Sequence, residues 1–101
     1  MPEPRFDAAR VLGERVREIR TGLGLSQEDV GDLAGMHWTN IGKIERGLGN
    51  PSFSTLIRIA GVLGVDPAKL VGGITPDQLP EHEHLLTARE LLDERRRRAR
   101  E

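Results

Sequence analysis

The stretch GMHWTNIGKIERG, residues 35–47, places the chain's one tryptophan, Trp38, among side chains that form hydrogen bonds. Ile41 and Ile44 have the spacing of an inward-facing pair on a short helix, and we expect Trp38 to face outward from it. Tryptophan is highly buried on average, so an outward indole needs an explanation. The question is whether Trp38 packs on its own domain, on a partner chain or on another molecule.

The chain offers little for catalysis or for metal binding. No nucleophile–base arrangement, phosphate-binding loop or pair of carboxylates in a plausible cleft can be recognised, and 101 residues leave little room for a pocket. There is no cysteine, and no two of His37, His82 and His84 have the i, i+4 spacing of a helical metal clamp. We therefore expect no enzyme, no metal and no cofactor.

Length and composition favour one small domain with a tail. No apolar run approaches the roughly 20 residues that a membrane-spanning helix needs, and the N-terminus lacks the apolar stretch of a signal peptide. A cytoplasmic protein without a membrane segment is expected. The formal net charge of −1, from 15 basic and 16 acidic residues, argues weakly against a nucleic-acid partner. A single basic face would suffice for such a partner, however.

The periodicity of apolar residues predicts an all-α fold with five helices in residues 6–71 and no strand. The predicted bounds are about 8–23, 26–34, 37–46, 52–63 and 67–71. The first helix has an apolar stripe made of Leu12, Val16, Ile19 and Leu23.

Capping residues support three of these helices. Asp7 is predicted to be the N-cap of the first helix. Ser26 and Asp29 have the spacing of a capping box at the second. Asp66 suits the N-cap of the fifth, with Pro67 at its first helical position.

Two glycines join the second and third helices. Gly31 lies in mid-helix, where it costs about 1 kcal/mol relative to alanine, so we expect a close approach of the two helices there. Gly35 can adopt the positive φ of a tight turn. Leu33 is expected to face inward with Val30 and Ala34, and the apolar residues expected to pin the helices together are Val30, Ala34, Ile41 and Ile44. Together these features predict a helix-turn-helix unit.

The rest of the chain is interpreted as a linker, residues 72–82, with a single turn at 76–79, and a charged helix, residues 83–101. This helix has a thin apolar stripe made of Leu85, Ala88, Leu92 and Ala99. An isolated helix of this length is only marginally stable in water and depends on packing of its apolar side. We therefore expect its leucines to contact a second copy, a partner protein or the chain's own domain. The RRRR run at 95–98 is flanked by acids, which favours a solvated helix face over a nucleic-acid arm.

The short motifs LSQ, IERG, NP and LxxIAxxLGV fall in order around the turn at Gly35. On these motifs, residues 12–71 resemble the Cro and phage-repressor-like (XRE-type) helix-turn-helix family. The resemblance implies a compact five-helix, lambda-repressor-like domain. It also implies a sequence-specific regulator of transcription that binds double-stranded DNA, with helix 37–46 in the major groove.

The resemblance assigns roles position by position. Base reading falls to His37, Trp38, Thr39 and Lys43. Phosphate contacts fall to Gln27, Asn40, Arg46, Asn50, Ser52, Arg10 and Arg17. Arg20 and Glu45 are expected to form a partly buried ion pair with a structural role.

Family members usually bind as dimers on inverted repeats, with half-sites about 34 Å apart. A homodimer contact is expected at residues 62–74 or in the helix 83–101. The alternative is a protein-interaction adaptor, such as the antitoxin of a toxin–antitoxin pair, with 83–101 binding a partner protein. The net charge of −1 and the additional helix favour that alternative.

Overall fold

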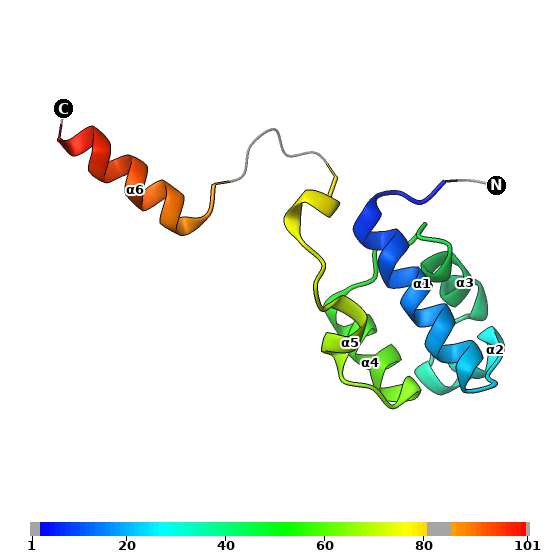
Figure 1. The fold of residues 1–101 in the computed structure, drawn as a ribbon. Coiled ribbons are helices and arrows are strands. Elements are labelled where there is room, and N and C mark those ends of the chain that lie inside the picture. Colours follow the sequence, from blue (N-terminus) through cyan, green and yellow to red (C-terminus); the bar gives the residue numbers. More distant parts are fainter. Residues whose placement is uncertain (1–2, 81–85, 101) are drawn as a thin grey trace.

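The computed structural model describes residues 3–80 and 86–100, and within them it contains helices and no strand. Figure 1 shows their order along the chain. The elements are α1 (Asp7–Gly22), α2 (Gln27–Ala34), α3 (Trp38–Glu45), α4 (Phe53–Leu63), α5 (Pro67–Val71), a 3-10 turn η1 (Pro76–Gln78) and α6 (Ala88–Ala99).

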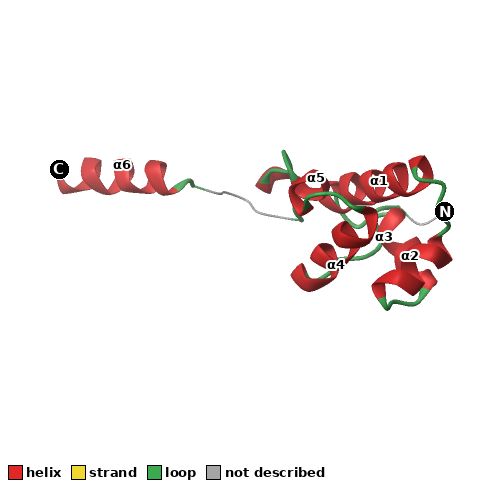
Figure 2. Cartoon of the chain, turned by 90° about the horizontal axis from the view of Figure 1, so that it is seen from below, coloured by secondary structure: helices red, strands yellow, loops and turns green. Residues whose placement is uncertain are grey.

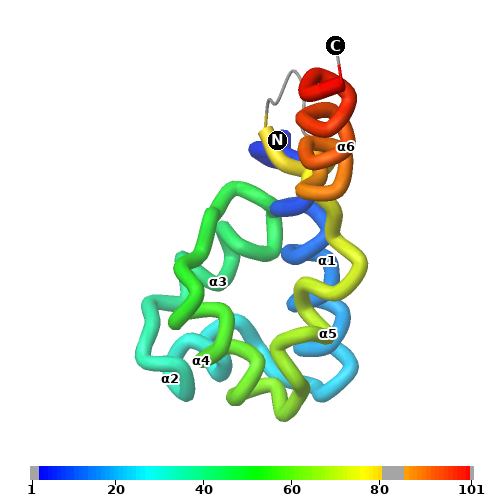
Figure 3. The backbone as a smooth tube through the Cα atoms, turned by 90° about the vertical axis from the view of Figure 1, so that its left-hand side faces the viewer, coloured from blue at the N-terminus to red at the C-terminus, as the bar shows by residue number. Residues whose placement is uncertain are grey.

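The core is aliphatic, and each of the first five helices contributes one large side chain that is completely buried. These are Val16, Val30, Ile41, Ile59 and Leu70. Burying a side chain of this size stabilises the fold by about 1.5–3 kcal/mol. Helix α1 packs against α3 and α5, while α4 packs against α2 and α5. Figures 2 and 3 show the five helices gathered into one body.

The caps of α2 and α5 are as predicted, and that of α1 is not. The Ser26 and Asp29 side chains accept hydrogen bonds from each other's backbone N–H, at 3.0 and 2.8 Å. Asp66 Oδ1 accepts from the Ala68 N–H at 2.9 Å. The prediction of Asp7 as N-cap is wrong. The Arg10 N–H donates to the Phe6 carbonyl at 3.1 Å, so the helix already includes Asp7 as its first residue.

The two glycines of the interhelical turn behave as predicted. A Cβ atom on Gly31 would lie 2.7 Å from the Met36 carbonyl oxygen and 3.2 Å from Trp38 Cα. Gly35 has φ of 68° and ends α2. The turn and the start of α3 therefore lie directly against α2, at a distance that only a glycine at 31 permits.

Two leucines expected in the core lie outside it. Leu33 is 67% exposed, because α2 turns Val30, Gly31 and Ala34 inward. Since successive helical residues are about 100° apart, Leu33 falls beyond that buried face. Leu23 is exposed because α1 ends at Gly22, one residue before it.

The C-terminal region also differs from the prediction. The turn η1 lies within the expected linker. The expected helix start at residue 83, and Leu85 with it, lie outside the described residues. Leu86 and Thr87 are not helical, since Thr87 and Glu90 form a capping box that begins α6 at Ala88. No residue of α6 is buried, and Figure 1 shows the helix standing clear of α1–α5. Within residues 3–80 and 86–100, no helix is both long and apolar enough to cross a membrane.

Candidate nucleic-acid interface

The start of α3 is held by an aromatic pair, His37 and Trp38. His37 is the N-cap, and its Nδ1 atom accepts from the Thr39 N–H at 3.2 Å and lies 2.7 Å from the Thr39 hydroxyl oxygen. The rings of His37 and Trp38 stack, with centroids 5.8 Å apart. His37 was predicted to read bases, but its Nδ1 is used within the chain. Its remaining ring atom for hydrogen bonding is Nε2.

Helix α3 has one buried side and one exposed side. Ile41 and Ile44 are buried, which anchors the helix to the core. Trp38 is 47% exposed, so the expectation that it faces outward is met in the structure. The other polar residues of the exposed side are Thr39, Asn40, Lys43 and Arg46. This arrangement holds hydrogen-bonding groups at fixed positions on a rigid helix.

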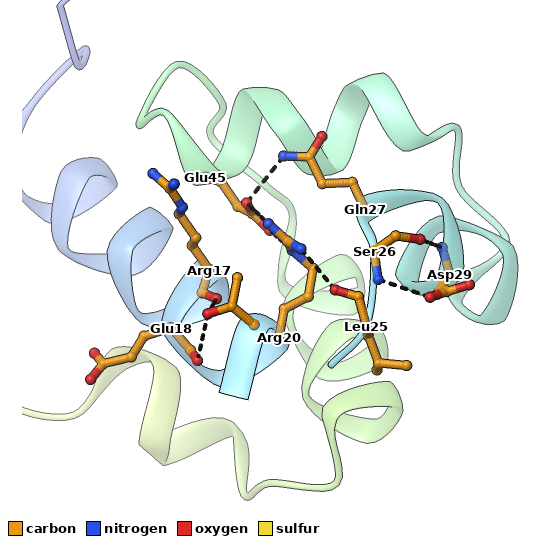
Figure 4. A network of polar contacts seen from close by, with 9 residues as sticks. Arg17, Glu18, Arg20, Leu25, Ser26, Gln27, Asp29 and Glu45 are labelled. Atoms are coloured by element: carbon orange, nitrogen blue, oxygen red, sulfur yellow. Dashed lines mark hydrogen bonds and ion pairs between the residues drawn. The ribbon is translucent and has the colours of Figure 1, made fainter. Parts of the chain in front are cut away.

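Behind that helix, Arg20 and Glu45 form the ion pair expected from the sequence (Figure 4). Arg20 Nε and Nη2 donate to the two carboxylate oxygens of Glu45 at 2.6 and 2.8 Å. Arg20 Nη1 also donates to the Leu25 carbonyl at 2.8 Å. The two side chains are only 11% and 3% exposed. Hydrogen bonding to Glu45 raises the pKa of Arg20, against the lowering effect of burial. The pair thus ties α1 to the end of α3.

Gln27 belongs to the same network. Its side-chain Nε2 donates to Glu45 Oε1 at 3.1 Å, which fixes the amide between α2 and α3 (Figure 4). One amide N–H remains for an acceptor such as a phosphate oxygen. Gly42, whose role the sequence did not reveal, is buried beside this amide. A Cβ atom on Gly42 would lie 3.3 Å from both Gln27 Oε1 and Arg46 Nη1.

A second close contact, which was also not predicted from the sequence, brings α1 against α3. A Cβ atom on Gly13 would lie 2.3 Å from the Ile44 carbonyl oxygen, so α1 touches the backbone of α3. A Cβ atom on Gly47 would lie 3.2 Å from Arg10 Cα. Arg10 therefore lies beside the loop that carries Arg46.

The remaining residues predicted to contact phosphate are exposed, but some already have partners. Arg10 Nη1 lies 3.0 Å from Glu14 Oε1. Ser52 caps α4, where its hydroxyl accepts from the Thr55 N–H at 3.2 Å. Arg17 and Asn50 are exposed on α1 and in the loop before α4. Of Leu85, Ala88 and Leu92, predicted for a dimer or partner contact, Leu85 lies outside the described residues, and the other two are not part of this surface. Ala88 and Leu92 are exposed on α6.

Two short helices joined at a left-handed glycine, the second with a buried apolar side and an exposed polar side, define a helix-turn-helix domain. A protein-family model described as helix-turn-helix (HTH_3) matches residues 16–70, and the chain belongs to this family. The all-α fold predicted from the sequence is confirmed.

Individual proteins show the same likeness. The chain is 40% identical over 66 residues to the control protein C.SmaI of Serratia marcescens, a match that covers 65% of this chain and 79% of that protein. The crystal structure of the restriction-modification controller protein C.AhdI from Aeromonas hydrophila superposes with a TM-score of 0.60 and 37% identity, over 61% and 94% of the two chains. That of the biofilm regulator SinR in complex with DNA has a TM-score of 0.56 and 32% identity, over 58% and 95%.

Proposed function

We propose that this chain is a cytoplasmic, sequence-specific, double-stranded DNA-binding regulator of transcription that inserts α3 into the major groove. The observation that carries the proposal is the exposed side of α3, with Trp38, Thr39 and Lys43 held over a buried apolar side. The major groove of B-DNA is about 12 Å wide and admits an α-helix. The likeness to restriction-modification control proteins and to a regulator solved with DNA supports the same function.

Base reading is proposed for the first two turns of α3. The Trp38 indole can lie against a thymine methyl group, and its N–H can donate to a base or phosphate acceptor. Thr39 can contact a methyl group or form a hydrogen bond. Lys43, one turn further, can reach a guanine edge. His37 stacks on Trp38 and holds the ring at the helix start, so we propose a positioning role with Nε2 as its one contact atom.

Phosphate contacts are proposed around this reading helix. The candidates are Gln27, Asn40, Arg46, Asn50, Ser52, Arg10 and Arg17. Gln27 would use the amide N–H that Glu45 does not occupy. Ser52 would use its backbone N–H, because its hydroxyl caps α4. Such contacts fix the register of the domain on the duplex and make affinity depend on salt, without carrying sequence information.

A homodimer is proposed as the binding unit, and the structure offers two apolar surfaces for it. On α4, Phe53 is 79% exposed and Ile57, one turn later, is 43% exposed. On α6, the exposed side chains include Ala88 and Leu92. The α4 pair is favoured, because α4 packs on the rigid body that carries α3. A twofold contact there would hold two reading helices about one DNA turn, roughly 34 Å, apart.

The test is selection of binding sites from a random pool of duplex DNA at one stated salt concentration. We expect enrichment of an inverted repeat with half-sites about one helical turn apart. A triple variant, Trp38→Ala, Thr39→Ala and Lys43→Ala, serves as the control, because its core is unchanged. We expect this variant to enrich no site. Failure of the wild-type chain to enrich any sequence would overturn the proposed function.

The second candidate is an adaptor that holds a partner protein, such as an antitoxin, and the exposed apolar side of α6 favours it. Leu91 and Leu92 are exposed on a helix that buries no residue. The two candidates differ in their DNA behaviour, since an adaptor alone would show no sequence preference. Leu91→Ser with Leu92→Ser should abolish partner binding by an adaptor and leave the DNA preference of a regulator intact.

A further inference from the structure

Helix α6 gathers arginines on one side. Arg89, Arg96 and Arg100 are spaced by seven and four residues, which places them on one face of a helix. Two shallow surface depressions confirm this grouping. One is lined by Asp93, Arg96, Arg97 and Arg100, and the other by Arg89, Leu92, Asp93 and Arg96. We call Arg89, Arg96, Arg97 and Arg100 the arginine face; with Asp93 among them, this side carries a formal charge of +3.

This face concentrates positive charge that the whole chain does not have. Residues 86–100 contain six arginines and three carboxylates, a formal +3, whereas the complete chain has a formal charge of −1. Residues 81–101 together hold six arginines and six carboxylates, so the positive charge is local to α6 and the residue that follows it and does not extend to the whole C-terminal segment. Asp93 is the one carboxylate that lines the two depressions, beside the four arginines of the face. Of the RRRR run, Arg96 and Arg97 belong to this face, whereas Arg98 pairs with Glu94.

Among the residues that the structure describes, the arginine face has no carboxylate partner. In the described ranges 3–80 and 86–100, the ion pair of α6 is that of Arg98 with Glu94, at 2.9 Å, and no member of the face pairs with a carboxylate. Arg96 and Arg100 lie one turn apart, where like charges destabilise a helix. A 12-residue helix that buries nothing is marginal in water. Bound anions would remove this repulsion and stabilise α6.

We propose that the arginine face of α6 binds the phosphate backbone of duplex DNA beside the site read by α3. The inference rests on the proposed function, which brings DNA to the chain. Guanidinium groups form paired hydrogen bonds with phosphate oxygens. From Arg89 to Arg100 the helix rises about 16 Å, and that length of duplex carries about ten phosphate charges. The duplex therefore offers more phosphates along this length than the face has arginines.

The covalent chain keeps α6 close to that ligand. Six residues separate Pro80 from Thr87, so whatever their conformation the seven Cα–Cα steps span at most about 25 Å. Once α3 is bound, the arginine face meets DNA as a tethered group, at an effective concentration far above that of free protein. Its contacts add affinity that is independent of sequence, because phosphates carry no base identity. The affinity for the operator and the affinity for unrelated DNA should therefore rise together.

The test compares two full-length variants of equal charge. Arg96→Gln with Arg100→Gln removes half of the arginine face, whereas Arg95→Gln with Arg98→Gln removes two arginines from other sides of α6. Binding constants are measured over a salt series on the selected operator duplex and on an unrelated duplex. Each lost phosphate contact should reduce the slope of log Kobs against log salt by about 0.9. We expect a reduction of about 1.8 per chain for the first variant and a much smaller change for the second.

The outcomes separate this inference from the proposed function. A wild-type slope in the first variant overturns the inference alone, provided that the wild-type chain still selects an operator. An equal loss in both variants also overturns it, because diffuse charge and not one face would be responsible. An arginine-dependent slope without any preferred sequence supports the inference and overturns the proposed function. No DNA binding at all overturns both. An unchanged ratio of operator to unrelated affinity in the first variant supports a phosphate contact.

Discussion

At the start of α3, two adjacent aromatic residues have different tasks. The sequence predicted both rings as readers of DNA, since both fall on matching positions of the motif. In the structure His37 caps the helix through Nδ1 and stacks on Trp38, which leaves Nε2 for a contact with DNA. The outward direction of Trp38 could be predicted from the helical spacing of its neighbours. The capping hydrogen bond through Nδ1 of His37 could not, because it depends on a ring rotamer that no spacing specifies.

Replacing Trp38 tests base reading at a single residue. Trp38→Ala should reduce the preference for the operator over unrelated DNA by roughly 1 kcal/mol or more, about a several-fold loss, because a contact to a base edge is removed. The measurement is competition between the two duplexes at fixed salt. Gln27→Ala is the contrasting variant, and it should weaken both affinities and leave the preferred sequence unchanged. Equal losses on all sequences for Trp38→Ala would contradict its role as a reader.

The buried pair of Arg20 and Glu45 gives the second residue-scale prediction. Glu45→Ala should lower the free energy of unfolding by about 3–5 kcal/mol, because Arg20 would remain buried without its carboxylate. The double variant Arg20→Met with Glu45→Leu should cost clearly less than Glu45→Ala alone, since no uncompensated charge remains. Denaturant unfolding of the wild type and the variants measures both values. A double variant as unstable as the single one would show that packing, and not charge, dominates at this position.

At the scale of elements, residues with helical periodicity or a short-range cap could be predicted, and positions fixed by packing could not. The box of Ser26 and Asp29 and the turn at Gly35 are local features, and both were found. Leu33 looked like a core residue, but the rotation of α2 is set by the close approach at Gly31. Gly13 and Gly42 face other helices, so their roles depend on a tertiary contact that one sequence does not reveal. The exposed side of α3 followed from its pattern, whereas the phosphate candidates followed from the resemblance alone.

The capping box of α2 predicts an acid-dependent stability. The pKa of Asp29 is lowered mainly by the hydrogen bond from the Ser26 backbone N–H, and further by hydrogen bonding to the Ser26 side chain. A carboxyl whose folded-state pKa is lowered stabilises the fold above its unfolded pKa, about 4, and loses that effect as pH falls through the folded value. Asp29→Asn should therefore be less stable than the wild type at pH 7, and the difference should close below about pH 4.

Unfolding in denaturant at a series of pH values makes this measurement. Asp32→Asn is the matched control, because Asp32 is an exposed carboxylate of the same helix that forms no capping hydrogen bond in the described residues. Its difference from the wild type should be smaller at pH 7. A gap for Asp29→Asn that persists unchanged at low pH would assign the loss to helix propensity and not to the charged box.

At the scale of the whole molecule, two pairs of exposed apolar side chains are candidates for contact with another chain. Phe53 and Ile57 lie on α4 within the five-helix body, and Leu91 and Leu92 lie on α6 outside it. Neither pair contributes to the core, so each is available for another chain. A contact through α4 would fix the distance between two reading helices, whereas a contact through the tethered α6 would leave that distance variable. Spacing of half-sites thus depends on which pair forms the dimer.

Phe53→Ser with Ile57→Ser should convert the proposed dimer into a monomer, because α4 would lose its exposed apolar pair. Stability of the domain should change little, since exposed substitutions usually cost within about 0.5 kcal/mol each. Binding to a full inverted repeat should weaken by a factor on the order of 100 or more as the second half-site becomes a separate binding event, while binding to one half-site stays unchanged. Sedimentation of the protein and titration of both duplexes measure these effects.

Leu91→Ser with Leu92→Ser is the matched variant on α6. If that variant becomes monomeric and the α4 variant remains a dimer, the contact belongs to α6, where Ala88 and Leu92 were predicted to provide it, and half-site spacing should then be loosely specified.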